Sequence, residues 1–202
     1  KLYGKKEIET ILRENPDSFL HVIKPDYAEG KYKSNSPELF ERNRQSFYDF
    51  VQREVFIRDG NKRFYVYRQD CNNESHTGII GCAAVDDYLN GKIKGHEQTH
   101  DDRVNLLKDY LNICRFNAEP VSLIYKNSPR INKINAEIMK MPALYDFCDS
   151  HNHRHRLWLV ERWEHIKGIT EKFATMPELY IADGHHRAAS SALHSKEMRK
   201  MR

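Results

Sequence analysis

The stretch YIADGHHRAASSA, residues 180–192, decides how the second half of this chain is expected to fold. Its first residues have the apolar composition of a buried strand, and the Asp183-Gly184 pair ends that strand. Small residues follow, and they favour a helix that packs tightly on a sheet. We therefore expect a strand, a glycine turn and a helix N-terminus in direct succession. Such a turn lets a ligand approach the backbone, and the first turn of a helix offers free N–H groups.

The chemistry of this stretch leaves three interpretations open. Arg187 is a bidentate donor suited to phosphate, and His185 and His186 add further donors beside the positive end of the helix dipole. That combination favours an anion site. An ordinary polar turn between a strand and a helix has the same composition. Paired histidines are also found in metal sites.

The rest of the chain predicts a mixed α/β or α+β fold, because helical and strand patterns alternate without strict regularity. Apolar spacing predicts helices over 5–14, 36–53, 86–93, 104–111, 131–141, 162–175 and after residue 184. Strands are expected over 18–23, 63–69, 77–85, 120–126, 144–148, 154–160 and 178–183. Residues 24–36 are rich in Pro, Gly, Ser and Asn, which predicts a loop.

Composition narrows the class of protein. The chain has 202 residues, 39% of them apolar and 31% charged, as in a soluble globular protein. The net charge of +4 is modest and its basic residues are scattered, which argues against nucleic acid as a partner. No apolar run is long enough for a membrane span. The four dispersed cysteines predict free thiols and a cytoplasmic location. The chain begins without Met and stops in its last expected helix, so we expect a piece of a longer protein.

HEQTH, residues 96–100, matches the H-E-x-x-H pattern of zinc proteases. On a helix, His96 and His100 would be metal ligands on one face and Glu97 would be the general base. The segment is flanked by polar residues, whereas zinc-protease helices are apolar around the motif. Glu119 is the nearest candidate for a third ligand, and it precedes a proline in an expected loop. A zinc protease therefore remains a subordinate alternative.

HNHRHR, residues 151–156, places three histidines at alternate positions. On a strand they would share one face, which suits a metal or an anion. A solvated hairpin leading into the next strand is favoured for His151 and His153. His155 lies closer to the apolar strand and is kept as a candidate substrate contact.

Taken together, these segments resemble the family catalogued as domain of unknown function 1015. The matching segments occur in the family's order and cover nearly the whole chain. They are 15–25 (NPDSFLHVIKP), 64–69 (FYVYRQ), 77–99, 101–103 (DDR), N-x-x-P-V at 117–121, 145–147 (YDF), 154–160 (RHRLWLV) and LYIADGHHRAAS at 179–190.

The resemblance implies a fold and a type of site. The family looks related to the ParB/sulfiredoxin-like superfamily, in which a G-x-x-R motif at a strand-helix junction binds nucleotide phosphates. Gly184 and Arg187 occupy these positions here, with His185, His186 and Ser190 as further nucleotide contacts. Some relatives with D-G-H-H-R are free-serine kinases that use ATP or ADP with Mg²⁺. By that likeness Asp183 is a catalytic and magnesium-binding candidate, and His186 a catalytic one.

The resemblance also changes the interpretation of HEQTH. The family has H-E-x-T followed by a variable residue, so the second histidine of the zinc pattern is a coincidence. The residues of the H-E-x-T pattern that still need an explanation are His96, Glu97 and Thr99, close in sequence to Arg103. These would supply a base, a hydroxyl and a cation to one cleft, with Glu97 as the catalytic base and the other three as substrate contacts.

We therefore expect a ParB/sulfiredoxin-like nucleotide-binding portion over 77–202, preceded by an N-terminal α/β portion over 1–76. The expected activity is phosphoryl transfer from ATP or ADP, or use of CTP, with Mg²⁺ and a small hydroxyl acceptor such as free serine. The alternative is a non-catalytic or NTP-hydrolysing switch that binds nucleotide. Neither a membrane nor nucleic acid is expected as a partner.

Overall fold

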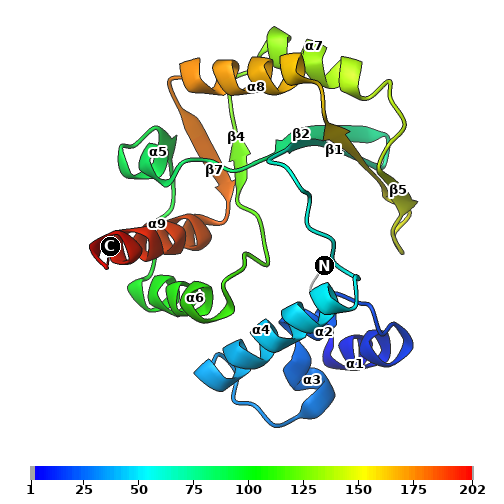
Figure 1. Ribbon diagram of the computed structural model, residues 1–202, viewed down its shortest axis with the longest axis vertical. Coiled ribbons are helices and arrows are strands. Elements are labelled where there is room, and N and C mark those ends of the chain that lie inside the picture. The colour runs from blue at the N-terminus through cyan, green and yellow to red at the C-terminus, as the bar shows by residue number, and fades with distance from the viewer. Residues whose placement is uncertain (1–2, 202) are drawn as a thin grey trace. The chain divides into compact units, whose positions relative to one another are not determined.

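The computed structural model describes residues 3–201 and shows a mixed α+β fold (Figure 1). The chain forms two compact units, each discontinuous in sequence. Unit 1 comprises Lys1–Arg58, Tyr88–Ile124 and Tyr180–Arg202, and unit 2 comprises Asp59–Asp87 and Tyr125–Leu179. The expected boundary after residue 76 falls inside strand β2 (Glu74–Ile80). Within the described residues, no helix combines the length and apolar character needed to cross a bilayer.

Unit 1 begins with four helices: α1 (Lys5–Glu14), α2 (Leu20–Ile23), α3 (Pro25–Glu29) and α4 (Pro37–Gln52). The start of α4 was predicted: the Ser36 side chain accepts the N–H of Leu39 at 3.2 Å, and Pro37 occupies the first turn. The end of α4, at Gln52, agrees with the expected helix over 36–53.

The strand expected over 18–23 is wrong, because α2 lies there. The Ser18 hydroxyl accepts the N–H of Leu20 at 3.3 Å, and the Val22 N–H bonds the Phe19 carbonyl at 2.9 Å. These local bonds satisfy the backbone without a neighbouring strand. Val22 is completely buried, so the apolar run reflects a short core helix rather than a sheet. The loop expected over 24–36 likewise contains α3, which begins at Pro25.

Helix α6 (Asp101–Cys114) packs against α4 in unit 1 through aromatic and sulfur contacts. Phe40 meets Tyr110 edge to face at 5.3 Å, and Phe47 stacks on Phe116 at 4.4 Å between ring centres. The buried Cys114 thiol donates to the Phe40 carbonyl at 3.2 Å. Burial raises the pKa of this thiol to about 11, so Cys114 is a packing residue. All four cysteines are free.

The sheet of unit 1 has the order β3-β7-β4 and leads into the last helix. Its strands are β3 (Ile93–Lys94), β7 (Leu179–Asp183) and β4 (Ser122–Ile124), and β4 runs antiparallel to β7. Helix α9 (His185–Lys200) follows β7 directly, as the opening stretch predicts. Lys108 of α6 pairs with Glu197 of α9 at 3.2 Å, which fixes these helices against one another. Along the sequence, the division between Asp87 of unit 2 and Tyr88 of unit 1 falls within a short helix, α5 (Val85–Leu89).

Unit 2 is a four-stranded antiparallel sheet of order β2-β1-β6-β5 with two helices. The further elements are β1 (Phe64–Cys71), β5 (Tyr145–Cys148), β6 (Arg154–Val160), α7 (Pro129–Ile138) and α8 (Trp163–Thr175). Asn72 and Asn73 form the β1–β2 turn with positive φ at both positions, as a tight hairpin requires. The second strand of this hairpin ends at Ile80, not at residue 85.

The core of unit 2 lies between the sheet and its helices. Val66, Trp158 and Val160 are buried on one face of the sheet, and α7 and α8 contribute buried Ile131 and Ile169. The Trp158 indole N–H donates to the Met141 carbonyl at 2.9 Å, so this large ring is fixed in one orientation.

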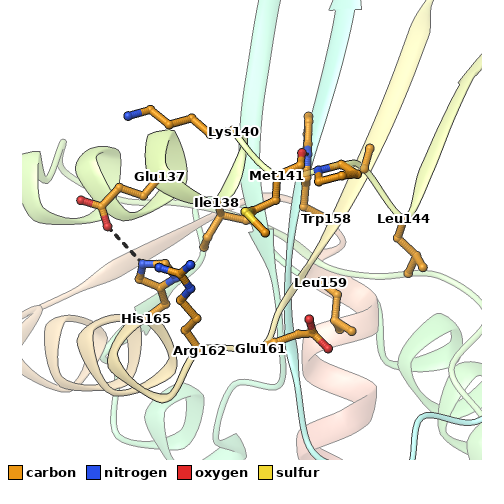
Figure 2. Close-up of a pocket in the computed structure, with 12 residues that line it drawn as sticks. Glu137, Ile138, Lys140, Met141, Leu144, Trp158, Leu159, Glu161, Arg162 and His165 are labelled. Atoms are coloured by element: carbon orange, nitrogen blue, oxygen red, sulfur yellow. Dashed lines mark hydrogen bonds and ion pairs between the residues drawn. The ribbon is translucent and has the colours of Figure 1, made fainter.

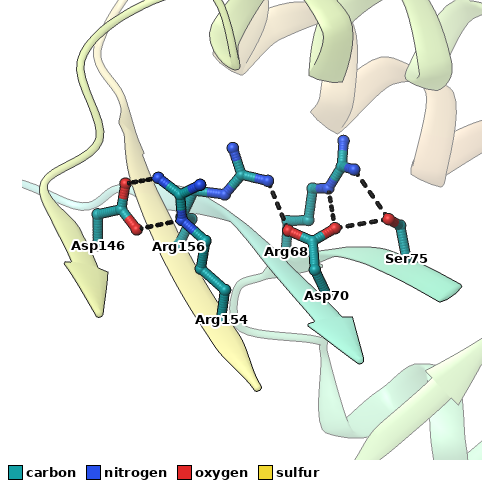
Figure 3. Close-up of polar contacts among 6 residues, drawn as sticks. All are labelled: Arg68, Asp70, Ser75, Asp146, Arg154 and Arg156. Atoms are coloured by element: carbon teal, nitrogen blue, oxygen red, sulfur yellow. Dashed lines mark hydrogen bonds and ion pairs between the residues drawn. The ribbon is translucent and has the colours of Figure 1, made fainter. Parts of the chain in front are cut away.

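The same face of the sheet carries a charged network further along the strands (Figure 3). Asp70 accepts hydrogen bonds from the Ser75 hydroxyl, from Arg156 and from Arg68, and these bonds hold the pKa of Asp70 well below its usual range. On the neighbouring strand, Arg154 forms two bonds to Asp146, at 2.8 and 2.7 Å. The network links β2, β1, β6 and β5, and it therefore supports their register.

Candidate functional site

The candidate site is built around the start of α9 in unit 1. Gly184 has φ +96°, a left-handed conformation that side chains rarely adopt. A Cβ atom at this position would lie 2.9 Å from Nε of Arg187, because that side chain crosses directly above the glycine. The turn therefore favours glycine, and a Cβ at this position would also displace the Arg187 side chain. The first-turn N–H groups of α9 have no acceptor within the helix, as at any helix N-terminus.

The HEQT segment lies against this helix start. Residues 95–100 form an irregular loop between β3 and α6. His96 donates its backbone N–H to Nε2 of His185 at 3.3 Å, although the two residues are 89 positions apart. Nδ1 of the same ring lies 3.3 Å from a carboxylate oxygen of Glu97. The structure thus brings the HEQT loop and the DGHHR turn into contact.

A second contact of the same kind involves the other histidine of the pair. His100 donates its backbone N–H to Nε2 of His186 at 3.2 Å, and the two rings stack at 5.9 Å. Loss of solvation and the charge of Arg103 lower the pKa of His186, so its ring is neutral near pH 7. The paired histidines therefore fasten the 95–100 loop to α9 by accepting backbone N–H groups.

These contacts determine the tautomer of both rings. A neutral imidazole has one acceptor nitrogen and one N–H, and in both rings Nε2 is the acceptor. The proton therefore sits on Nδ1, and in His185 this Nδ1–H faces Glu97. His185 is only 5% exposed, whereas the Glu97 side chain is 61% exposed. The pair thus presents a carboxylate to solvent and keeps the imidazole behind it.

Arg187 is held by acidic and carbonyl groups rather than left free. It pairs with Asp183 and with Glu119, the latter at 3.1 Å, and donates to the Pro120 carbonyl at 2.5 Å. The Asp183 carboxylate is 76% exposed. An anion that binds NH1 or NH2 of this guanidinium would compete with these partners. Glu119 and Pro120 were missed as partners of Arg187, although they lie in the 117–121 segment of the family resemblance.

The other predicted site residues of unit 1 differ in their surroundings. Thr99 lies half-buried in the 95–100 loop, and Arg103 lies in the first turn of α6, beside that loop. Ser190 is 1% exposed and its hydroxyl donates to the Arg187 carbonyl at 3.0 Å, so it belongs to the packed face of α9. Gly95 was also missed: a Cβ there would lie 3.0 Å from Cδ2 of His185, so a side chain at this point would press on the ring.

His155 lies in unit 2, on β6. Its Nδ1 is 2.6 Å from the Tyr67 hydroxyl, and its ring stacks on Phe147. His151 and His153 lie at the β5–β6 hairpin, as predicted, and both donate backbone N–H groups to Asp149. These bonds, that of His153 first, lower the pKa of Asp149 to about 2. The alternating histidines are therefore explained by a hairpin.

The zinc-protease arrangement is not formed, because HEQTH is a loop and not a helix. Ligand atoms of His96, Glu97 and His185 nevertheless lie within 4.8 Å of one another, a donor set that suits zinc. The tautomer argues against this. A metal on Nδ1 of His185 would need the proton on Nε2, where it would face the N–H donor of His96. The Glu97 carboxylate is therefore better matched to a proton on His185 than to a metal ion.

Unit 2 contains an open pocket of about 650 Å³ between α7, β6 and the start of α8 (Figure 2). Trp158, Met141 and Leu159 form part of its wall. His165 lies 3.1 Å from Glu137 at its edge. The volume is in the range of small-molecule sites, yet the charges around it do not converge on one point.

Comparison with known proteins identifies the family. The model of a family described as "Protein of unknown function (DUF1015)" matches residues 2–202. No curated protein and no solved structure matches the chain. Since the match extends over nearly every residue, the chain belongs to this DUF1015 family.

Proposed function

We propose that unit 1 binds a nucleotide through the start of α9 and transfers its terminal phosphoryl group to a small hydroxyl compound. The contact between His185 and Glu97, at 3.3 Å, carries this proposal. It places an exposed carboxylate directly beside a helix N-terminus that follows a glycine turn. Phosphoryl transfer needs these two features, an anion cradle and a group that accepts the proton of the attacking hydroxyl.

The phosphates would bind the free N–H groups of the first turn of α9 and the guanidinium of Arg187. Phosphate offers the same fork geometry as the carboxylates that now hold this side chain. Replacing Asp183 by phosphate would release an exposed carboxylate beside the phosphate. Asp183 is then suited to hold Mg²⁺, which binds through one or two carboxylates together with substrate phosphates. ATP, ADP and CTP all carry the necessary groups.

The resemblance of the DGHHR motif to those of the ParB/sulfiredoxin-like superfamily and of free-serine kinases favours the same assignment. Free serine is accordingly the first acceptor to test. Thr99 lies on the same loop as Glu97 and Arg103 lies in the first turn of the helix that follows, so both are candidate contacts for a polar acceptor. Nε2 of His186 accepts the backbone N–H of His100. In this proposal His186 therefore anchors the loop and does not transfer a proton.

A second candidate function is a nucleotide-dependent switch without transfer. Arg187 ties the start of α9 to Glu119 and Pro120, the residues that lead into β4. If a phosphate binds the Arg187 guanidinium in place of Glu119 and Pro120, these bonds are lost and the 117–121 segment is released. Such an exchange would report nucleotide binding to a partner without any chemistry.

Two variants separate these functions. Arg187→Ala should abolish nucleotide binding in calorimetry with MgATP, while Arg130→Ala, a paired arginine on α7, should leave it unchanged. Unaltered affinity in Arg187→Ala would remove the basis of the assignment. Phosphorus NMR with ATP, ADP or CTP, Mg²⁺ and an amino-acid mixture then reads turnover. Glu97→Gln should bind nucleotide and lose turnover, whereas binding without turnover in the unaltered protein favours the switch.

A further inference from the structure

His185 has a combination of features that a merely polar helix residue would not need. Its ring is 5% exposed, and both ring nitrogens have polar groups within 3.3 Å. Gly95 passes so close to the ring that a Cβ atom would lie 3.0 Å from Cδ2. The His96 ring covers it edge to face at 4.4 Å between centres. The imidazole is therefore enclosed, fixed in orientation and restricted to one tautomer.

This arrangement assigns different roles to the two members of the pair. The enclosed imidazole has no free lone pair, because Nε2 accepts the His96 N–H and Nδ1 carries the proton. It therefore cannot take a proton from a substrate without losing its bond to the loop. Glu97 has an exposed carboxylate, and one of its oxygens faces His185. Glu97 is therefore the member of the pair that offers an exposed acceptor to a hydroxyl.

We infer that His185 is a positioning residue that holds Glu97 as the proton acceptor for the attacking hydroxyl. The inference rests on the proposed function and specifies how its base is oriented. In the transfer step, the acceptor oxygen forms a bond to the terminal phosphorus as its proton passes to Glu97. The bond from that phosphorus to the bridging oxygen breaks, and the shortened nucleotide leaves with the electron pair. Glu97 then releases its proton to water, and His185 keeps its own proton throughout.

Two substitutions distinguish positioning of Glu97 from simple fastening of the loop. Asparagine places an amide N–H near the position of Nδ1, so His185→Asn keeps the donor to Glu97 and loses the acceptor for His96. Glutamine places an amide oxygen near the position of Nε2, so His185→Gln keeps the loop contact and loses the donor to Glu97. The exposed His76 on β2 provides a matched control as His76→Gln.

The rate constant is the first readout. We expect His185→Gln to lower kcat by roughly ten- to a hundredfold with little change in the KM for nucleotide, as a misplaced catalytic group does. His185→Asn should retain most of kcat, and His76→Gln should be unchanged. If His185→Gln keeps kcat and His185→Asn loses it, the histidine serves the loop and the inference is wrong.

The second readout does not depend on activity. Two-dimensional ¹H–¹⁵N correlation of the histidine rings distinguishes the Nδ1–H from the Nε2–H tautomer. We expect the Nδ1–H form for His185, with a ring signal that changes in Glu97→Ala. An Nε2–H form, or a signal indifferent to Glu97, overturns the inference. If the unaltered protein transfers no phosphoryl group, the proposed function fails, and this spectrum alone decides whether His185 holds Glu97.

Discussion

His100 donates its backbone N–H to Nε2 of His186, and this single bond joins the start of α6 to the start of α9. His185 makes the equivalent bond to His96 a few residues earlier in the loop. The two histidines of DGHHR therefore act on the protein's own backbone. Both bonds join the HEQT loop to the α9 N-terminus, and the ring of His185 makes an additional contact to Glu97.

The bond from His100 makes the loop sensitive to acid. The pKa of His186 is lowered in the folded state, so the neutral ring favours folding. Its stabilising effect is complete above the ordinary histidine pKa of 6.5 and is lost as the pH falls through the lower folded-state pKa. The protection factor of the His100 amide against hydrogen exchange, which corrects for the intrinsic pH dependence, should therefore fall between about pH 7 and about pH 5. His186→Gln keeps an acceptor that does not titrate and should remove the effect. Equal protection at both pH values would contradict this account.

Gly184→Ala should destabilise unit 1. Alanine in this left-handed conformation costs about 1 kcal/mol, and the displaced Arg187 side chain adds to that cost. The free energy of unfolding from urea titration should fall by roughly 1–3 kcal/mol. Gly60→Ala, where a Cβ meets nothing within 4 Å, is the control and should change it by less than about 0.5 kcal/mol. Equal effects of the two substitutions would show that the turn is not constrained as described.

Asp70→Asn should weaken unit 2 at neutral pH and leave it more similar to the unaltered protein in acid. Bonds from Ser75, Arg156 and Arg68 lower the pKa of Asp70, so the stability they contribute is present above the ordinary value of 3.8. It is lost progressively as the pH falls from that value toward the lower folded-state pKa, because the carboxyl takes up its proton first in the unfolded chain. Thermal unfolding between about pH 7 and about pH 2 measures this convergence. Asp59→Asn, in an exposed turn, should show no such pH dependence; a matching curve would refute the role of the network.

The purified protein should not bind zinc stoichiometrically. The tautomer of His185 sets its proton toward Glu97 and leaves no lone pair for a metal at Nδ1. Elemental analysis of the purified chain should find far less than one zinc per molecule, and a chelator should leave the melting temperature unchanged. One tightly held zinc, lost in His185→Asn, would show that the His96–Glu97–His185 cluster is a metal site.

Much of the fold could be predicted from local signals. Ser36 and Pro37 predict the start of α4, and the structure has it there. The strand, turn and helix of residues 178–192 are also confirmed, because apolar composition, Asp-Gly and small residues all agree. The run over 18–23 was misassigned since a short apolar segment fits a strand and a buried helical turn equally well.

The site could be predicted only in part. The sequence singled out Glu97, His185 and Arg187, but their partners are set by contacts across 89 and 67 positions. No periodicity shows that His185 accepts the N–H of His96 or that Arg187 is held by Glu119. A serine hydroxyl can bind phosphate, but Ser190 lies on the buried face of α9, where its hydroxyl donates to the Arg187 carbonyl. His155 belongs to unit 2, whereas the DGHHR and HEQT motifs belong to unit 1.

One measurement decides whether the DGHHR turn and the HEQT loop form a single nucleotide site. Backbone amide signals of the ¹⁵N-labelled chain are followed during titration with MgATP. The account predicts that the amides of Gly184, His185 and Arg187 shift together with those of Glu97 and His100, at one common affinity, and that Arg187→Ala abolishes the response. Shifts confined to unit 2, or no shift at millimolar nucleotide, would contradict it.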